Sequence, residues 1–161
     1  ITSSVLAASI FMLMAVIFGL VFIYKNLYQL ATLGTVILSG ISLLFLFILV
    51  LPNQAPLWLA KNISSDIRKE FGIIPPIISA GYNEPSLVFM TRTDIKFGSG
   101  ADAAIFLHKL KTSVAVVDER ENKLFLTATR DKGIVVRKIA EAKGLNYSRG
   151  KWKNISVYVK N

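Results

Sequence analysis

The sequence predicts a membrane α-helical hairpin followed by a small α/β domain with a mixed sheet outside the membrane. Two uncharged apolar stretches, residues 5–24 and 31–51, are each long enough to cross a bilayer core of about 30 Å as a helix. Between the first residue and Pro56, the only charged side chain is Lys25. After Pro56, helix-like and strand-like segments alternate, which is typical of α/β domains.

The two apolar stretches are best interpreted as transmembrane helices within residues 1–56. A buried hairpin of a soluble protein is the alternative, but two consecutive uncharged spans of this length are rare in soluble chains. The short link at residues 25–30 predicts a tight hairpin. Lys25 favours a cytoplasmic link, because short cytoplasmic loops are enriched in Lys and Arg. The following domain would then be external, periplasmic in a Gram-negative cell.

The beginning of the chain lacks the pattern of a secretory signal. Ile1 enters the apolar stretch directly, with no positively charged segment before it and no small-residue cleavage site after it. We therefore expect the chain to be the C-terminal segment of a longer protein.

Charge and composition narrow the possible partners and metal sites. The chain of 161 residues has a formal charge of +9, and the part after Pro56, with 18 basic and 10 acidic residues, has a charge of +8. Such a charge favours anionic partners such as lipid headgroups, phosphates or nucleic acid, without choosing among them. The chain has no cysteine and a single histidine, His108, which excludes disulfides, thiolate metal sites and histidine clusters.

Residues 57–72 are predicted to form an amphipathic connecting helix that Gly72 ends. Pro52 and Pro56 terminate the second span, and Trp58 is placed as an interfacial anchor. Apolar side chains then recur every four residues: Leu59, Ile63, Ile67 and Phe71. The helix either lies on the membrane or covers the core of the domain. We favour the second interpretation, because a small domain needs apolar cover.

Residues 73–161 are predicted to be the external α/β domain. The predicted strands are 77–81, 94–97, 113–118, 134–142 and 155–160. The last two are expected to form a hairpin around residues 144–150. A short helical turn is expected to begin at Pro85, and a longer helix to cover residues 101–111. Residues 120–122 are predicted to be a turn, and 124–130 are ambiguous between helix and strand.

Several polar residues are candidates for a site, each with a structural alternative. Tyr82 and Glu84 lie at the end of a predicted strand, although Glu84 could instead stabilise the start of the next helical turn. Glu84 and Asp94 could form a carboxylate pair, but no spacing requires them to meet. The turn at residues 98–100 could present N–H groups to a phosphate, although a structural turn is favoured. His108 is interpreted as a residue of the helix surface.

A basic cluster lies at the tip of the predicted C-terminal hairpin. Its members are Tyr147, Arg149, Lys151, Trp152 and Lys153. The composition is typical of a patch that contacts nucleic acid or lipid phosphates, but a solvated hairpin tip is the favoured interpretation. We expect no nucleic-acid partner.

Two segments of the domain resemble those of a known family. Residues 80–89 (AGYNEPSLVF) and 144–151 (GLNYSRGK), the latter followed by a final strand, resemble the C-terminal region of bacterial polyprenyl-phosphate-dependent membrane glycosyltransferases. These are the aminoarabinose-transferase-like and protein-mannosyltransferase-like enzymes. The helix start at residues 100–104 also resembles that family. The resemblance covers most of residues 81–161 and, less specifically, the two spans.

The resemblance implies transfer of a sugar from a polyprenyl-phosphate carrier to lipid A, lipopolysaccharide or protein. It implies a multi-pass protein of the bacterial inner membrane, in contact with membrane lipids. The family's catalytic acid lies in a loop near the N-terminus that this segment lacks. We therefore expect no catalytic residue, no metal ligand and no cofactor here, although a divalent metal could belong to the missing part.

The resemblance implies that residues of this segment could contact the substrate or another part of the enzyme, but would not take part in catalysis. The candidate interface or substrate contacts are Tyr82, Glu84, Arg149 and Lys151. The alternative function is a free-standing, two-span anchored periplasmic module that binds or scaffolds without enzymatic activity.

Overall fold

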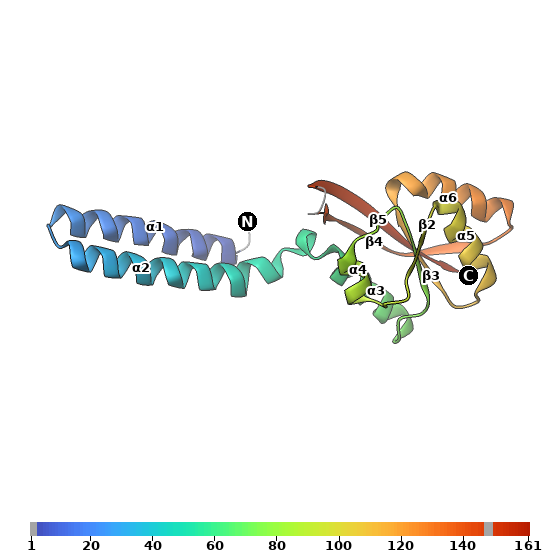
Figure 1. Ribbon diagram of the computed structural model, residues 1–161, viewed down its shortest axis with the longest axis horizontal. Helices are drawn as coiled ribbons and strands as arrows, with labels where there is room; N and C mark the ends of the chain where they lie inside the picture. Colours follow the sequence, from blue (N-terminus) through green and yellow to red (C-terminus); the bar gives the residue numbers. More distant parts are fainter. Residues whose placement is uncertain (1–2, 147–149) are drawn as a thin grey trace. The chain divides into compact units, whose positions relative to one another are not determined.

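The protein folds into two compact units, Ile1–Gln54 and Ala55–Asn161, in a computed structural model (Figure 1). The structure describes residues 3–146 and 150–161. The two units are considered separately below.

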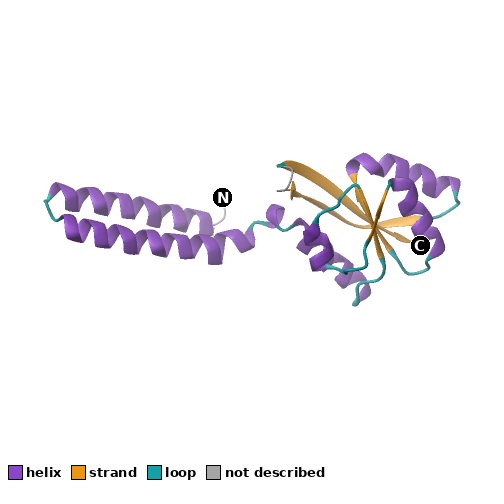
Figure 2. Cartoon of the chain, viewed as in Figure 1, coloured by secondary structure: helices purple, strands orange, loops and turns teal. Residues whose placement is uncertain are grey.

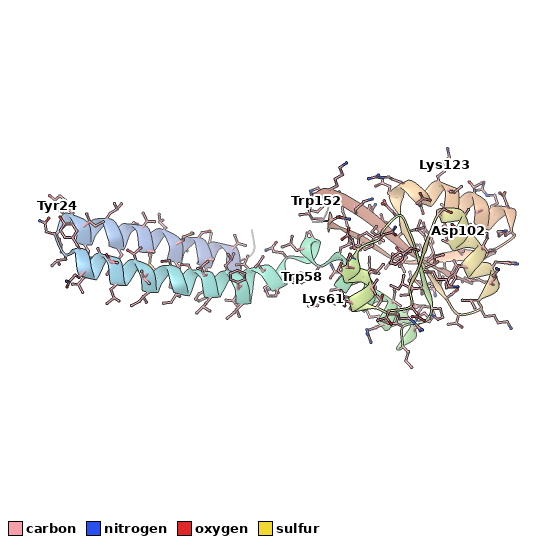
Figure 3. The ribbon with its side chains drawn as sticks, viewed as in Figure 1. Tyr24, Trp58, Lys61, Asp102, Lys123 and Trp152 are labelled. Atoms are coloured by element: carbon pink, nitrogen blue, oxygen red, sulfur yellow. The ribbon has the colours of Figure 1, made fainter. Side chains whose placement is uncertain are left out.

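The first unit is a hairpin of two apolar helices, as predicted. Helix α1 spans Ser3–Tyr24 and helix α2 spans Tyr28–Phe45, with Tyr24 next to the turn between them (Figure 3). A π-helical turn, η1 (Leu46–Val50), and a 3₁₀ turn, η2 (Leu51–Asn53), extend α2. The link is shorter than the predicted 25–30, because nothing in residues 28–30 stops a helix from starting at Tyr28.

Both helices are long and apolar enough to cross a membrane. Within the described residues, the candidate spans are Val5–Tyr24 and Tyr28–Asn53. Only 11% of the most apolar window of each is buried within the chain, whereas a core helix of a soluble protein is mostly buried. Small residues allow the helices to approach closely. A Cβ atom on Gly34 would collide with the ring of Phe18, and one on Gly19 would lie 2.9 Å from Thr35 Oγ1.

The second unit contains the predicted mixed sheet. Within the described residues, its five strands are β1 (Ile77–Ala80), β2 (Lys96–Gly98), β3 (Val114–Asp118), β4 (Val136–Asn146) and β5 (Lys151–Lys160), in the order β2-β1-β3-β5-β4. Strand β1 is parallel to both β2 and β3, whereas β5 is antiparallel to β3 and β4. The prediction of an α/β domain with a mixed sheet is confirmed.

Helices cover both faces of the sheet (Figures 1 and 2). They are α3 (Leu59–Phe71), α4 (Pro85–Met90), α5 (Gly100–Lys109) and α6 (Glu119–Asp131), with a 3₁₀ turn, η3 (Ala55–Leu57), before α3. Pro85 begins a helical turn as predicted. One core lies between the sheet and α3 with α4, and the other lies between the sheet and α5 with α6. The cores share the sheet, because alternate residues of each strand face opposite sides.

Helix α3 covers the domain core, which confirms the favoured interpretation of its apolar face. Leu59, Ile63 and Ile67 are at most 1% exposed and pack in the same core as Ile77 and Val157. The left-handed φ of +70° at Gly72 ends the helix.

The predicted turn at residues 120–122 is wrong, because these residues belong to the first turns of α6. Asp118 caps this helix, since its Oδ1 accepts a hydrogen bond from the N–H of Arg120 at 3.4 Å. The ambiguity of residues 124–130 is resolved as helix. Phe125 and Thr129, one helical turn apart, are its buried residues.

The C-terminal hairpin is longer than predicted. Strand β4 reaches Asn146 and β5 starts at Lys151, so Gly144 lies within a strand and not in a loop. A Cβ atom on Gly144 would lie 2.6 Å from the carbonyl oxygen of Pro56, which explains the glycine as a close approach between two segments of the domain. The other strands agree with the prediction to within two residues at each end.

Candidate ligand-binding site

A polar cleft of about 260 Å³ opens at the carboxyl ends of β1 and β3. Its lining residues come from the segments after these strands and from the β4–β5 hairpin: Gly81, Asn83, Glu84, Asp118, Arg120, Glu121, Asn146 and Lys153. Among the described residues, the lining contains no hydrophobic side chain, whereas the usual ligand pocket is mostly apolar.

The strand order explains why a cleft forms at this position. From β1 the chain passes through α4 to β2 on one side, and then through α5 to β3 on the other side of β1. The segments that leave β1 and β3 therefore run toward opposite faces of the sheet and separate. Such a switch point, at the carboxyl ends of parallel strands, is where open α/β sheets bind ligands.

Gly81 lets the chain leave β1 without filling the cleft. Its φ is +80°, in the left-handed region that side chains rarely adopt. A Cβ atom there would also lie 3.0 Å from Asp118 Cβ and 3.0 Å from Glu121 Cγ. Both constraints favour glycine at the cleft floor.

A buried ion pair between Lys153 and Asp118 forms one wall of the cleft. Their side chains are only 6% and 3% exposed. Asp118 lies at the end of β3 and caps α6, whereas Lys153 lies on β5. The pair therefore joins a parallel strand, a helix start and the antiparallel hairpin. Removing one partner of such a pair leaves a buried uncompensated charge, which is strongly destabilising.

A second buried contact joins Glu84 to Asn146. The Nδ2 of Asn146 donates to Oε1 of Glu84 at 2.6 Å, and the two residues are 4% and 8% exposed respectively. This hydrogen bond spans 62 positions of sequence, from the segment after β1 to the end of β4. Glu84 is also the residue immediately before α4, but its side chain makes no capping hydrogen bond to that helix.

The remaining lining residues lie nearer to solvent. Glu121 is partly buried, and its Oε2 accepts a hydrogen bond of 2.7 Å from the N–H of Gly100 at the start of α5. Arg120 and Asn83 are exposed. The cleft thus has a buried inner part of paired groups and an accessible rim with one guanidinium and one carboxamide group.

The other residues predicted as contacts lie in different surroundings. Tyr82 is 3% exposed and packs in the core on the α3 side, and its carbonyl accepts a hydrogen bond from Ser79 Oγ at 2.6 Å. Lys151 is exposed at the start of β5, and Arg149 lies outside the described residues. Trp152, in the same basic cluster, is 61% exposed on the hairpin (Figure 3).

Lys153 was predicted to belong to a basic cluster at a solvated hairpin tip. This prediction is wrong for Lys153, because its side chain is buried. Strand alternation separates it from Trp152 and directs it into the cleft. Asp118 and Asn146 were not recognised as site residues. Asp118 ends an apolar strand at a predicted turn, which was the signal available in the sequence. Asn146 lies in the resembling segment 144–151, but nothing in the sequence set it apart within that segment.

The turn at residues 98–100 caps a helix, as the structural interpretation expected. The Oγ of Ser99 accepts from the N–H of Asp102 at 3.3 Å, and Oδ2 of Asp102 accepts from the N–H of Ser99 at 2.9 Å. This capping box, with the N–H of Gly100 bound to Glu121, engages donors that a phosphate would need. The hydrogen bonds from Ser99 hold the pKa of Asp102 below its ordinary value.

The remaining candidates lie on the domain surface. His108 is exposed in the last turn of α5. Asp94 does not pair with Glu84; it pairs with Arg92 through two hydrogen bonds of 2.7 Å, and these lower the pKa of the Asp94 carboxyl. Among the residues that the structure describes, no group of three His, Asp or Glu residues is placed to hold a metal ion.

Comparison with known proteins yields no relative. No family model matches the chain, and neither a curated protein nor a solved structure matches it.

We predict that Lys153→Met lowers the free energy of unfolding by about 3–5 kcal/mol, because it leaves Asp118 buried without its cation. Adding Asp118→Asn should recover part of this loss, because asparagine removes the charge and still caps α6. Denaturant unfolding in detergent, followed by tryptophan fluorescence, measures the effect on this domain, since Trp58 and Trp152 both lie in it.

Lys151→Met is the matched control for that experiment, because Lys151 is exposed on the same strand. It should change stability by no more than about 0.5 kcal/mol. Equal effects of the two lysine substitutions, or a double variant less stable than Lys153→Met alone, would contradict a structural role for the buried pair.

The capping box predicts a pH dependence of stability. Because folding lowers the pKa of Asp102, its contribution is present above the unfolded value of about 3.9 and is lost as the pH falls through the lower folded pKa. Asp102→Asn should therefore flatten the acid side of the profile of unfolding midpoint against pH. A profile with the wild-type slope for Asp102→Asn would contradict this prediction.

Proposed function

We propose that this chain is the C-terminal segment of an integral membrane glycosyltransferase. The full enzyme would move a sugar from a polyprenyl-phosphate carrier to lipid A, lipopolysaccharide or a protein acceptor. In this proposal it is a multi-pass protein of the bacterial inner membrane, and the α/β domain is periplasmic.

The observation that carries the proposal is that two of the resembling segments meet in one cleft. Glu84, from residues 80–89, accepts a hydrogen bond from Asn146, in residues 144–151, and both residues line the cleft. The third segment lies next to it, because Gly100 donates to Glu121 of the lining. This proximity supports a resemblance that reflects a shared site.

The helical hairpin is consistent with this proposal. Two apolar helices long enough to span a membrane precede the domain, as the terminal spans of a multi-pass enzyme would. The catalytic acid is assigned to a loop outside this segment, so the domain would act in binding or docking. Glu84 and Lys151 remain candidate contacts for that role, whereas Tyr82 would act from within the core.

The second candidate is a free-standing, two-span anchored module that binds or scaffolds. The observation that favours it is the self-contained domain, with cores on both faces of its sheet and a cleft formed by its own residues. The discriminating observation is the reading frame upstream of Ile1. Further apolar spans and an acidic first external loop favour the transferase, and a start codon just before Ile1 favours the module.

We predict that the turn between α1 and α2 faces the cytoplasm and that the domain is external. Leu27→Cys and Lys123→Cys test this, because the chain has no native cysteine and Lys123 points outward from α6 (Figure 3). An impermeant maleimide on intact spheroplasts should label only Lys123→Cys, and both should react after permeabilisation. Labelling of Leu27→Cys alone before permeabilisation would reverse the topology.

We predict that the complete reading frame transfers radiolabelled sugar from a polyprenyl-phosphate donor, whereas residues 1–161 alone transfer none. The reason is that this segment lacks the loop assigned to the catalytic acid. Membranes expressing either form are assayed for label in lipid A, lipopolysaccharide and protein. Transfer by the segment would show that it contains catalytic residues. No transfer by the complete protein from pentose or hexose donors would refute the proposed function.

A further inference from the structure

We propose that the cleft at the ends of β1 and β3 binds one ring of an uncharged, polyhydroxylated ligand, that is, one saccharide unit. This inference goes beyond the proposed function and does not rest on it, because a transferase and an anchored module could each use such a site. It follows from the size of the cleft, the charge of its lining and its position in the sheet.

The size of the cleft restricts the ligand to about one ring. Its volume of about 260 Å³ lies just below the range of roughly 300–1,000 Å³ for pockets that hold drug-sized molecules. A cleft of this size holds a single ring of about a dozen heavy atoms. Such a ligand would bind with a dissociation constant on the order of millimolar. Longer chains would have to extend past the exposed rim at Asn83 and Arg120.

The charge of the lining disfavours an anion. Of the lining residues that the structure describes, three are acidic and two are basic, which gives a formal charge of −1. Lys153 is already engaged by Asp118, so its charge is not available to neutralise a phosphate. This negative lining is notable in a chain whose formal charge is +9.

The chemistry of the lining favours hydroxyl groups. Carboxylates only accept hydrogen bonds, Lys and Arg only donate them, and carboxamides do both. The outer lining offers both kinds of group, because the Arg120 guanidinium donates, the Glu121 carboxylate accepts and the Asn83 carboxamide does both. Neighbouring hydroxyls of a saccharide can donate to one of these groups and accept from another without breaking the buried pairs.

The buried ion pair is not explained by folding alone. Replacing a buried pair by apolar residues of similar volume is often neutral or stabilising, so such a pair is weak evidence for a purely structural role. Here the pair lines an open cleft at the switch point of the sheet, where α/β folds bind ligands. The Asp118 cap of α6 and the glycine at position 81 hold the polar groups in place around that cleft.

The test is saturation-transfer NMR on the 161-residue chain in a detergent without a sugar headgroup. The probes are D-glucose, D-galactose, D-mannose and L-arabinose, each at about 10 mM to match the expected affinity. Inorganic phosphate and ethylammonium chloride are added as charged competitors. We expect transfer to at least one sugar, unaffected by either competitor.

The double variant Asn83→Ala, Arg120→Ala should weaken that binding at least tenfold, because it removes the exposed rim donors. Lys123→Ala is the matched control, since Lys123 lies on α6 outside the lining and should leave binding unchanged. Asn83→Trp, which fills the mouth of the cleft, is a second variant, and tryptophan fluorescence confirms that each variant is folded.

No transfer to any of the four sugars would overturn the proposal, as would transfer that survives both rim variants. Competition by phosphate would identify an anion site, and competition by ethylammonium would identify a cation site. Either result would also overturn it. None of these results bears on sugar transfer by the complete reading frame, so failure here is distinguishable from failure of the proposed function.

Discussion

The contact between Lys153 and Asp118 is the constraint on which the rest of the external domain depends. Strand β3 is the central strand, parallel to β1 on one side and antiparallel to β5 on the other. Asp118, its last residue, caps α6 and meets the ammonium group of Lys153 from β5. A shift of β5 by one residue would turn Lys153 to the other face. The ion pair therefore fixes the register of the hairpin against the parallel half of the sheet.

The two cores reinforce the same register. On β5, Ile155 and Val157 pack on the α3 side, the side to which Lys153 also points. Tyr158 faces α6, where its hydroxyl donates to Asn122 at 2.8 Å and its ring lies 4.9 Å from that of Phe125. The buried apolar side chains and the Lys153–Asp118 ion pair thus specify the same register of β5 in the sheet. The cleft is the space that remains at the carboxyl ends of β1 and β3, where the chain leaves these two strands toward opposite faces of the sheet.

The sequence predicted those elements whose signal is local. The four-residue period of α3, the apolar runs of α1, α2 and β3, and the proline at the start of α4 are each determined by residues close together. The start of helix α6 was predicted as a turn and its remainder left ambiguous, because its first turn is charged and only Phe125 and Thr129 are buried. To predict where α6 begins, one has to recognise that Asp118 caps this helix as well as ending β3.

Strand β4 was predicted too short for a related reason. It lies at the edge of the sheet, and the exposed Lys143, followed by Gly144, ends the apolar pattern just after the predicted end at residue 142. Exposed charges such as Lys143 protect an edge strand from pairing with other chains. Gly144, which reads as a turn residue, is required by the approach of Pro56.

The cleft itself could not be predicted, because its residues come from three segments that only the strand order brings together. Residues 81–84 follow β1, residues 118–121 follow β3, and Asn146 and Lys153 belong to the hairpin. Glu84 was identified as a polar residue at a strand end, but the spacing along the chain gives no reason to pair it with Asn146. Lys153 was grouped with its neighbours in sequence, whereas strand alternation separates it from Trp152.

The distribution of charge gives the domain two distinct surfaces. Most basic side chains are exposed, so the domain as a whole favours contact with anionic surfaces such as lipid headgroups. The cleft is an exception, because among its described lining residues three carboxylates outnumber two cations, one of which is buried in a pair. The exposed surface of the domain therefore attracts anions over long distances, whereas the lining of the cleft disfavours them at close range. Salt should screen the long-range attraction, whereas hydrogen bonds inside a partly buried cleft are much less sensitive to salt. A domain of this kind can approach an anionic surface while its cleft selects a neutral ligand.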